Sequence, residues 1–422
     1  MASNSFTRTG TANAYDAALR QLTTRQNSLS ALQENLTSGK RVVRASDDPT
    51  AAAQAERART RIDRIATEQR ALEIQKNSIT QAEGALGDAT EILQKFRDLV
   101  VQAGNGGNSP LERVTIAGQL TALRDELLTI ANRKDGNGLP LFSGLGSLDQ
   151  PFNSSSDGTP PDPDYSYDGL NGQQSATDVA IPFAMNGRTT WMDVPESNGL
   201  FHVSLGAANT GQAFSDIGVV TDPTTAAAAG NGYDYSISFD TTTTPATYTV
   251  TNTTTATPVL TAQPYTPGQA IKFNGLSLTV KGTPGNGDVL NLTANVPADR
   301  PSIFGVLDRA IAGMYNPGTL TGASSTSANF NHELAISLAQ VDTSLERIGA
   351  ARGQAGDLLN RADTITDTQS QRSIQSEGDR SRAEDLDMIK GISDFQNQQT
   401  SYSAALQSYA SIQKLSLFNF LS

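Results

Sequence analysis

The chain has 422 residues, of which 37% are apolar and 18% are charged, and its net charge is −12 at neutral pH. Its length and apolar content allow two or three buried cores, and its negative charge argues against a nucleic-acid partner. The absence of cysteine excludes thiol catalysis, disulfides and thiolate metal sites. No run approaches the ~18 apolar residues of a membrane span, so we expect no membrane insertion. The N-terminus also lacks a signal-peptide core, so we expect any export to use a route without a hydrophobic leader.

The N-terminal segment predicts an amphipathic helix with a narrow apolar stripe that includes Leu19, Leu22, Leu29 and Leu36. A second predicted helix has apolar residues at strict intervals of seven from Ile65 to Val100. A strict seven-residue repeat predicts left-handed supercoiling against a partner helix.

The stretch LTSGKRVVRASDDPT, residues 36–50, connects these two helices. A phosphate-binding loop would need glycine at position 34, where the chain has Glu34, so we reject that interpretation. Catalysis by the paired aspartates is the weaker alternative to a structural turn. The predicted joint has Gly39 ending the first helix, Asp48 capping the next helix before Pro49, and Lys40, Arg41 and Arg44 paired with Asp47 and Asp48.

A third helix is predicted to start at Ser109 and Pro110, with Glu112 completing a capping box, and to end near Arg133. Residues 151–169 are rich in Pro, Gly and Asp and predict a linker. Alternating segments at 233–240, 246–252, 270–282 and 287–294 predict strands of an all-β domain. Residues 148–301 contain fourteen acidic and four basic residues, which indicates a solvated, outward-facing domain.

The C-terminal third returns to helical periodicity. Residues 334–348 have the spacing of a coiled-coil seam, and residues 386–412 form a last amphipathic segment. The terminal stripes are too thin to offset the ordering of the chain alone, so we expect them to become ordered on assembly. The predicted assembly interface consists of Leu19, Leu22, Leu29, Leu36, Leu406, Tyr409, Ile412, Leu415, Leu417 and Phe418.

Two metal-site candidates are weak. HELAI at 332–336 has isoleucine where a zinc-protease helix needs its second histidine, and the other histidine of the chain is His202. DPDYSYDG at 162–169 lacks the glycine and the final glutamate of an EF-hand loop. We therefore expect no catalytic residue, no metal and no cofactor.

The joint sequence and the C-terminal SYSAALQSYASIQKLSLFNFLS resemble the two ends of the bacterial flagellin superfamily. The Asp-Asp-Pro at 47–49, GLPLFSG at 138–144 and the closing SLFNFL are similar to the hook-associated protein 3 family. The likeness covers roughly 10–147 and 302–422, and the start MASNSFTRTG departs from it.

The resemblance implies type III export without a cleaved leader and a ring of eleven subunits between hook-associated protein 1 and flagellin. It also implies a core tube of paired terminal helices and an export chaperone that binds the C-terminal helix.

These observations predict a flagellin-like α+β multidomain protein in which N- and C-terminal helices pair as coiled coils around a central all-β insertion. The predicted domains are a terminal-helix domain (1–45 and 381–422), a helical bundle (46–147 and 302–380) and an outer β domain (148–301). The predicted function is that of a secreted hook–filament junction adaptor of the flagellum, without enzymatic activity. The alternatives are a filament flagellin and, from another class, a secreted metal-dependent hydrolase; glycan binding by the β domain stays open.

Overall fold

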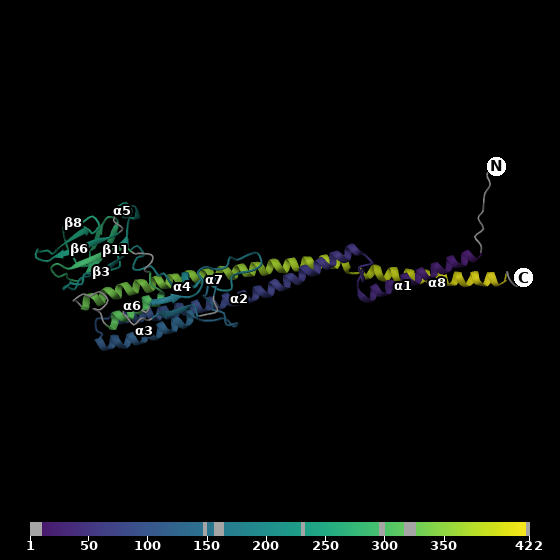
Figure 1. Ribbon diagram of the computed structural model, residues 1–422, viewed down its shortest axis with the longest axis horizontal. Coiled ribbons are helices and arrows are strands. Elements are labelled where there is room, and N and C mark those ends of the chain that lie inside the picture. The colour runs from purple at the N-terminus through teal and green to yellow at the C-terminus, as the bar shows by residue number, and fades with distance from the viewer. Residues whose placement is uncertain are drawn as a thin grey trace. The chain divides into compact units, whose positions relative to one another are not determined.

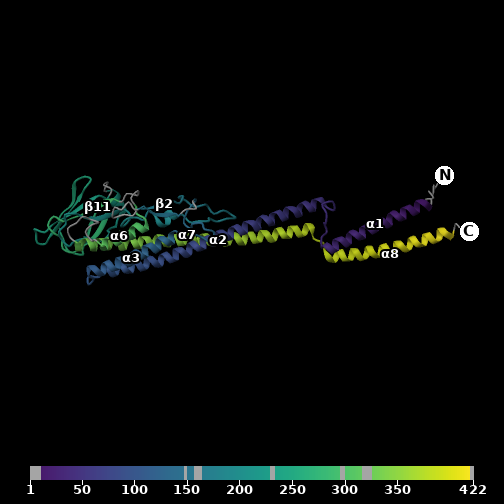
Figure 2. The same ribbon diagram turned by 60° about the horizontal axis from the view of Figure 1, so that its bottom comes forward.

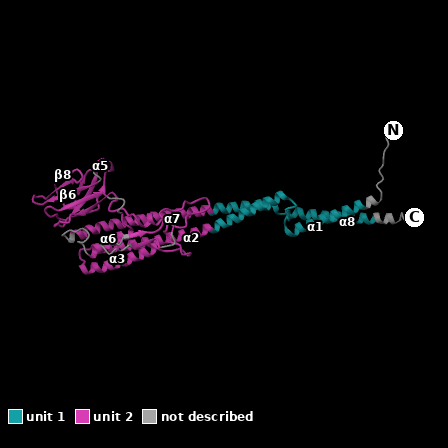
Figure 3. Cartoon of the chain, viewed as in Figure 1, with its two compact units in different colours: residues 1–70, 366–422 teal, residues 71–365 magenta. Residues whose placement is uncertain are grey.

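The computed structural model describes residues 11–146, 150–155, 164–228, 233–294, 300–315 and 326–418, without the side chains of 11–15, 155, 164, 326–327 and 412–418. Its contacts divide the chain into two compact units, shown in Figure 3. The first unit comprises residues 1–70 and 366–422, and the second comprises residues 71–365. Two long helices, α2 (Pro49–Ala103) and α7 (Thr326–Glu384), contribute residues to both units.

The first unit is built entirely from helices. Helix α1 (Thr11–Ser38) and helix α8 (Met388–Phe418) lie side by side, as both ribbon views show (Figures 1 and 2). The start of α2 and the end of α7 form the rest of this unit. The two ends of the chain therefore pair with each other.

The helical part of the second unit has one continuous core. Its helices are the remainder of α2, α3 (Pro110–Ala131), α6 (Ile303–Tyr315) and the first part of α7. The heptad positions of α2 from Leu72 to Val100 are buried in this core, because the seven-residue repeat keeps them on one face. Ion pairs link α2 to α7 beside the core, including Arg97 to Asp342 at 2.6 Å. The predicted capping box of Ser109 and Glu112 at the start of α3 is confirmed.

A short hairpin and a short helix complete this core. Strands β1 (Phe152–Ser155) and β2 (Asp164–Tyr167) pair antiparallel, and α4 (Gly187–Trp191) follows them. The rings of Phe152, Tyr165 and Trp191 surround Phe304 of α6. The prediction of a linker over 151–169 was wrong at both ends of that segment, where β1 and β2 form instead. The cause is that aromatic residues among the polar ones are buried against the helices. The predicted domain boundaries stay a prediction.

The β domain of the second unit contains two further antiparallel sheets around its own core. One sheet has the order β3-β11-β6-β7-β8, and in the other β10 pairs with β4, β5 and β9. Its elements are β3 (Phe201–Leu205), β4 (Phe214–Ser215), β5 (Val219–Val220), α5 (Pro223–Ala228), β6 (Tyr235–Asp240), β7 (Thr247–Asn252), β8 (Thr257–Pro264), β9 (Ala270–Phe273), β10 (Leu276–Lys281) and β11 (Val289–Ala294). The four strand-bearing segments predicted from alternation are confirmed.

Strand β8 forms one edge of the five-stranded sheet. Most of its residues are exposed, and Pro258 and Pro264 lie near its two ends. Its pairing with β7 shifts register near Val250, and Ala262 has a positive φ of 46°. A strand with these features offers few regularly spaced backbone hydrogen-bonding groups along its open edge.

Candidate assembly surface and helix joint

The α1–α8 pair contains most of the predicted assembly residues. Leu22, Leu29 and Leu36 are half-buried in the pair, and Tyr409 of α8 is half-buried as well. Leu19 and Leu406 stay 39% and 43% exposed. The side chains of the other four predicted residues lie outside the described part of the chain; they are Ile412, Leu415, Leu417 and Phe418.

The pair is incompletely buried within one chain. Among the described side chains of α1 and α8, none of the large apolar ones is fully buried. In contrast, Ile79, Leu86 and Leu93 of α2 are completely buried. Two helices that share so thin an apolar contact gain little from each other, so most of their stabilisation must come from further packing.

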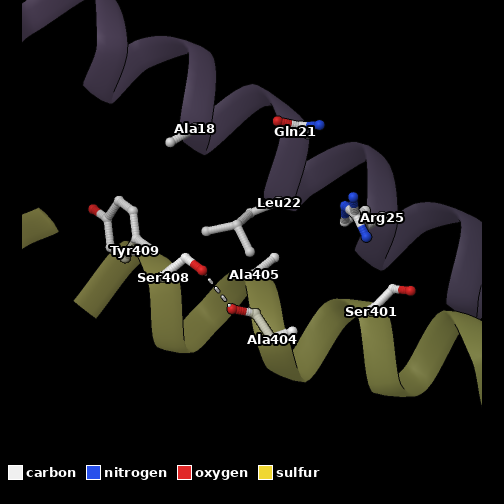
Figure 4. A pocket seen from close by; sticks show the side chains of 9 residues that line it. All are labelled: Ala18, Gln21, Leu22, Arg25, Ser401, Ala404, Ala405, Ser408 and Tyr409. Carbon is white, nitrogen blue, oxygen red and sulfur yellow. Dashed lines mark hydrogen bonds between the residues drawn. The ribbon is translucent and has the colours of Figure 1, made fainter. Parts of the chain in front are cut away.

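A groove runs between α1 and α8 (Figure 4). Its volume is about 480 Å³, and small side chains such as Ala18, Ala404 and Ala405 line much of it. Leu22 projects from α1 toward α8 within this groove, as Figure 4 shows. Small residues leave room for side chains from outside the pair, which suits a surface that packs against another helix.

The joint after α1 is tied by backbone hydrogen bonds to the segment before α8. Gly39 directly follows α1 and has a positive φ of 69°, a conformation that glycine adopts at no steric cost. The N–H groups of Arg41 and Val42 donate to the carbonyl of Glu384 at 2.7 and 3.3 Å. The N–H of Leu386 donates to the carbonyl of Gly39 at 2.9 Å. Both connecting segments of the first unit are thus held together at one place.

Asp48 caps the start of α2, which begins at Pro49. Its Oδ1 accepts from the N–H groups of Ala51 and Thr50 at 3.0 and 3.2 Å and from the Thr50 hydroxyl at 2.7 Å. The hydrogen bond from the Ala51 N–H is the main cause that lowers the pKa of Asp48 to about 2, with help from Thr50 and Arg41. The carboxylate is therefore ionised at every ordinary pH and accepts hydrogen bonds from N–H groups that have no partner within the helix.

Glu384 at the end of α7 is the centre of the joint, and sequence reasoning missed it. Its side chain is 8% exposed, and both of its carboxylate oxygens accept from Arg59 at 2.6 and 2.7 Å. Lys40 forms a second ion pair with it. Burial alone raises the pKa of Glu384, but Lys40 and Arg59 outweigh burial, so that the pKa is lowered overall.

Of the three basic side chains that were predicted to pair with Asp47 and Asp48, one forms such an ion pair. Arg41 contacts Asp48 at 3.2 Å, whereas the Arg44 side chain pairs with Glu34 at 2.8 Å. Lys40 pairs with Glu384 instead. Asp47 accepts from the Arg44 N–H at 2.8 Å and so closes the turn by its side chain. For Lys40 the reason is the distance in sequence: Glu384 is more than 300 positions away, and no local pattern indicates it.

The protonation of Asp48 should weaken the joint at low pH. Because the folded-state pKa is depressed, its stabilisation is present above the unfolded value of about 3.9 and is lost as the pH falls toward 2. Hydrogen exchange at the Ala51 amide, corrected for intrinsic rates, should show protection falling across this window. Asp48→Asn keeps a capping oxygen and should remove the pH step, whereas Asp48→Ala should lower protection at all pH values. An unchanged step in Asp48→Asn would assign it to another group.

Replacement of Glu384 by glutamine should loosen the joint more than the same replacement of an exposed glutamate does. Glu384→Gln removes the charge that faces Arg59 and Lys40 and leaves two basic groups side by side. We expect faster hydrogen exchange at the Arg41 and Val42 amides. The matched control is Glu377→Gln, because Glu377 is exposed and pairs only with its helix neighbour Arg380 among the described residues. Equal exchange rates in both variants would contradict a central role for Glu384.

The described residues of the two metal-site candidates do not assemble into a site. His332 is buried, and its Nε2 and Nδ1 lie 2.9 and 3.2 Å from the carbonyls of Val203 and Ser215. Its ring therefore connects α7 to strands β3 and β4. Within the described residues, no group of three or more His, Asp or Glu side chains is arranged to hold a metal ion. Residues 162 and 163 of the calcium candidate lie outside the described part. No described helix is long and apolar enough to cross a membrane.

Comparison with known proteins shows which class of proteins this chain resembles. Residues 10–147 match the family model of the bacterial flagellin N-terminal helical region. The chain is 34% identical over 147 residues to flagellar hook-associated protein 3 of Salmonella typhimurium, which is 34% of this chain and 45% of that protein. It is 39% identical over 145 residues to flagellin of Bacillus subtilis, 32% of this chain and 45% of that protein. The chain thus spans less than half the length of these relatives, and it is a homologue of flagellin-type structural proteins.

The structural likeness is longer and more specific. The flagellar junction protein FlgL from Legionella pneumophila aligns with 74% of this chain and 99% of that chain, with 29% identity and a TM-score of 0.64. The chain is therefore similar to hook-associated protein 3 and to FlgL as well as to flagellin. The predicted resemblance and the α+β flagellin-like fold class are confirmed.

Proposed function

We propose that this protein is a structural subunit of the bacterial flagellum and acts as the adaptor at the hook–filament junction. The observation that carries the proposal is the fold shared with FlgL over nearly the whole of that protein. Its terminal helices leave an apolar pair incompletely buried, as expected of a subunit that is completed by neighbours. The role requires no catalytic residue, and we propose none.

Assembly proceeds in our proposal by coupled ordering and packing of α1 and α8. Leu22, Leu29 and Leu36 hold the two helices together in one chain. Leu19 and Leu406 remain available for neighbouring subunits. The proposed core-tube interface also includes Tyr409 and the predicted residues Ile412, Leu415, Leu417 and Phe418. Removal of this apolar surface from water provides the driving force.

The domain roles and partners follow the predicted scheme. Residues 1–45 with 381–422 form the inner tube, 46–147 with 302–380 the surrounding bundle, and 148–301 the outward-facing domain. The ring has eleven copies and lies between hook-associated protein 1 and flagellin. An export chaperone covers the C-terminal helix before type III export, because an exposed apolar stripe would otherwise aggregate.

A deletion strain tests the junction role against the filament role. If the chain is the adaptor, cells without it should secrete intact flagellin monomers and build no filament, and the wild-type gene should restore filaments. A strain that lacks flagellin altogether would instead support a filament flagellin. The structural match to FlgL, which covers 74% of this chain, supports the adaptor.

A further inference from the structure

The first unit contains a second groove that the terminal-helix interface does not use. It lies between the start of α2 and the end of α7, and its volume is about 440 Å³. Four arginines line it: Arg41, Arg57 and Arg61 come from the N-terminal part of the chain, and Arg382 comes from α7. Asp48 and Asp379 line it as well, so the arginines outnumber the carboxylates and the lining is basic overall.

Among the residues that the structure describes, two of the four guanidinium groups are neutralised by ion pairs. Arg41 pairs with Asp48 at 3.2 Å, and Arg382 pairs with Asp379. Within the described residues, no ion pair is formed by Arg57 or Arg61, which are exposed and lie four positions apart on one face of α2. Two like charges at this spacing destabilise an isolated helix. A carboxylate partner from outside the chain would relieve that repulsion.

The floor of the groove consists of small side chains. Ala51, Ala58 and Ala383 line the groove and are each nearly buried. The four arginines line the same groove, so charged groups lie beside these small residues. Its shape and charge fit extended carboxylate side chains better than a large apolar anchor.

We propose that this arginine groove docks an acidic face of a second copy of the same chain, within residues 71–365. The proposal rests on the proposed function, in which copies pack side by side. Residues 1–70 and 366–422 carry sixteen basic and fourteen acidic residues, a net charge of +2. The remaining 295 residues carry the complementary net charge of −14. Guanidinium–carboxylate pairs between copies fix register and orientation more than they add affinity.

Site-specific cross-linking tests which partner occupies the groove. The chain has no cysteine, so Gln54→Cys in the groove introduces a single thiol that carries a photoreactive group. Irradiation of isolated flagella should give a product of twice the 44.5 kDa chain, joined through a peptide of residues 71–365. Ala66→Cys, exposed on α2 outside the groove, is the control and should give little of that product. A product with another protein, with residues 1–70 or 366–422, or with no protein would overturn the proposal.

Charge reversal gives a second, independent test. Arg57→Glu with Arg61→Glu should reduce several-fold the amount of chain that stays on flagella during a high-salt wash. The matched control, Arg64→Glu with Arg372→Glu, changes the charge equally at exposed positions outside the groove and should be retained like the wild type. Wild-type protein absent from flagella would refute the proposed function itself. Equal retention of both variants, with the wild type present, would refute only the groove inference.

Discussion

Truncation of the chain after residue 380 should leave the second unit folded and abolish incorporation into flagella. The deletion removes α8 and Glu384, so α1 loses its partner helix and the joint loses its central carboxylate. The core of residues 71–365 keeps all of its buried side chains. Hydrogen exchange should show unchanged protection in that unit. Sedimentation should show a monomer, and immunoblots of sheared flagella should show none of the truncated chain.

Point substitutions in the full-length chain sharpen this expectation. Leu22→Asp with Leu29→Asp places charges in the α1–α8 contact and should prevent incorporation without removing any segment. The matched control, Gln26→Asp with Asn27→Asp, adds the same two charges at exposed positions of α1 and should be incorporated normally. If the truncated chain or the double leucine variant entered flagella, the terminal helices would not be the assembly element.

The largest stability loss in the second unit is expected for Phe304→Ala. Phe304 is completely buried and contacts three rings, with centroid distances of 5.8 Å to Trp191, 5.9 Å to Phe152 and 5.1 Å to Tyr165. Removal of a buried phenylalanine side chain lowers the free energy of unfolding by about 3–5 kcal/mol, because it leaves a cavity. Trp191 is the only tryptophan of the chain, so its fluorescence reports urea unfolding of this core directly.

Phe183→Ala is the matched control for that measurement. Phe183 belongs to the same unit but is 41% exposed, so its replacement should lower the free energy of unfolding by only about 1 kcal/mol. The contrast isolates burial as the cause, since the chemical change is identical. Equal losses in the two variants would mean that the aromatic cluster does not stabilise the core.

The helical frame could be predicted because it depends on local repeats. The seven-residue spacing from Leu72 to Val100 places these side chains on one face, and the structure buries them. The capping box at Ser109 and strands β6 and β11 could be predicted for the same reason, because each depends on a sequence pattern only a few residues long. The pairing order of these strands had to come from the structure, since strand alternation says nothing about neighbours.

The missing parts share one physical cause, which is long-range packing. Phe152 and Tyr165 lie in a segment dominated by Pro, Gly and Asp, and their burial depends on Phe304, more than 130 positions away. Glu384 likewise has no local feature that distinguishes it from the exposed acids of α7. Its role arises only because Lys40 and Arg59 meet it from the other end of the chain.

The exposed edge strand β8 affects how closely the β domains of several copies can lie to one another. Any assembly of many copies raises the local concentration of the β domains far above that of a free protein. An open, regular edge would then serve as a template on which strands of adjacent copies add to one another. Pro258 and Pro264 offer no amide hydrogen, and the register shift against β7 interrupts the regular ladder. The β domains can therefore lie at high density while the five-stranded sheet of each copy ends within its own molecule.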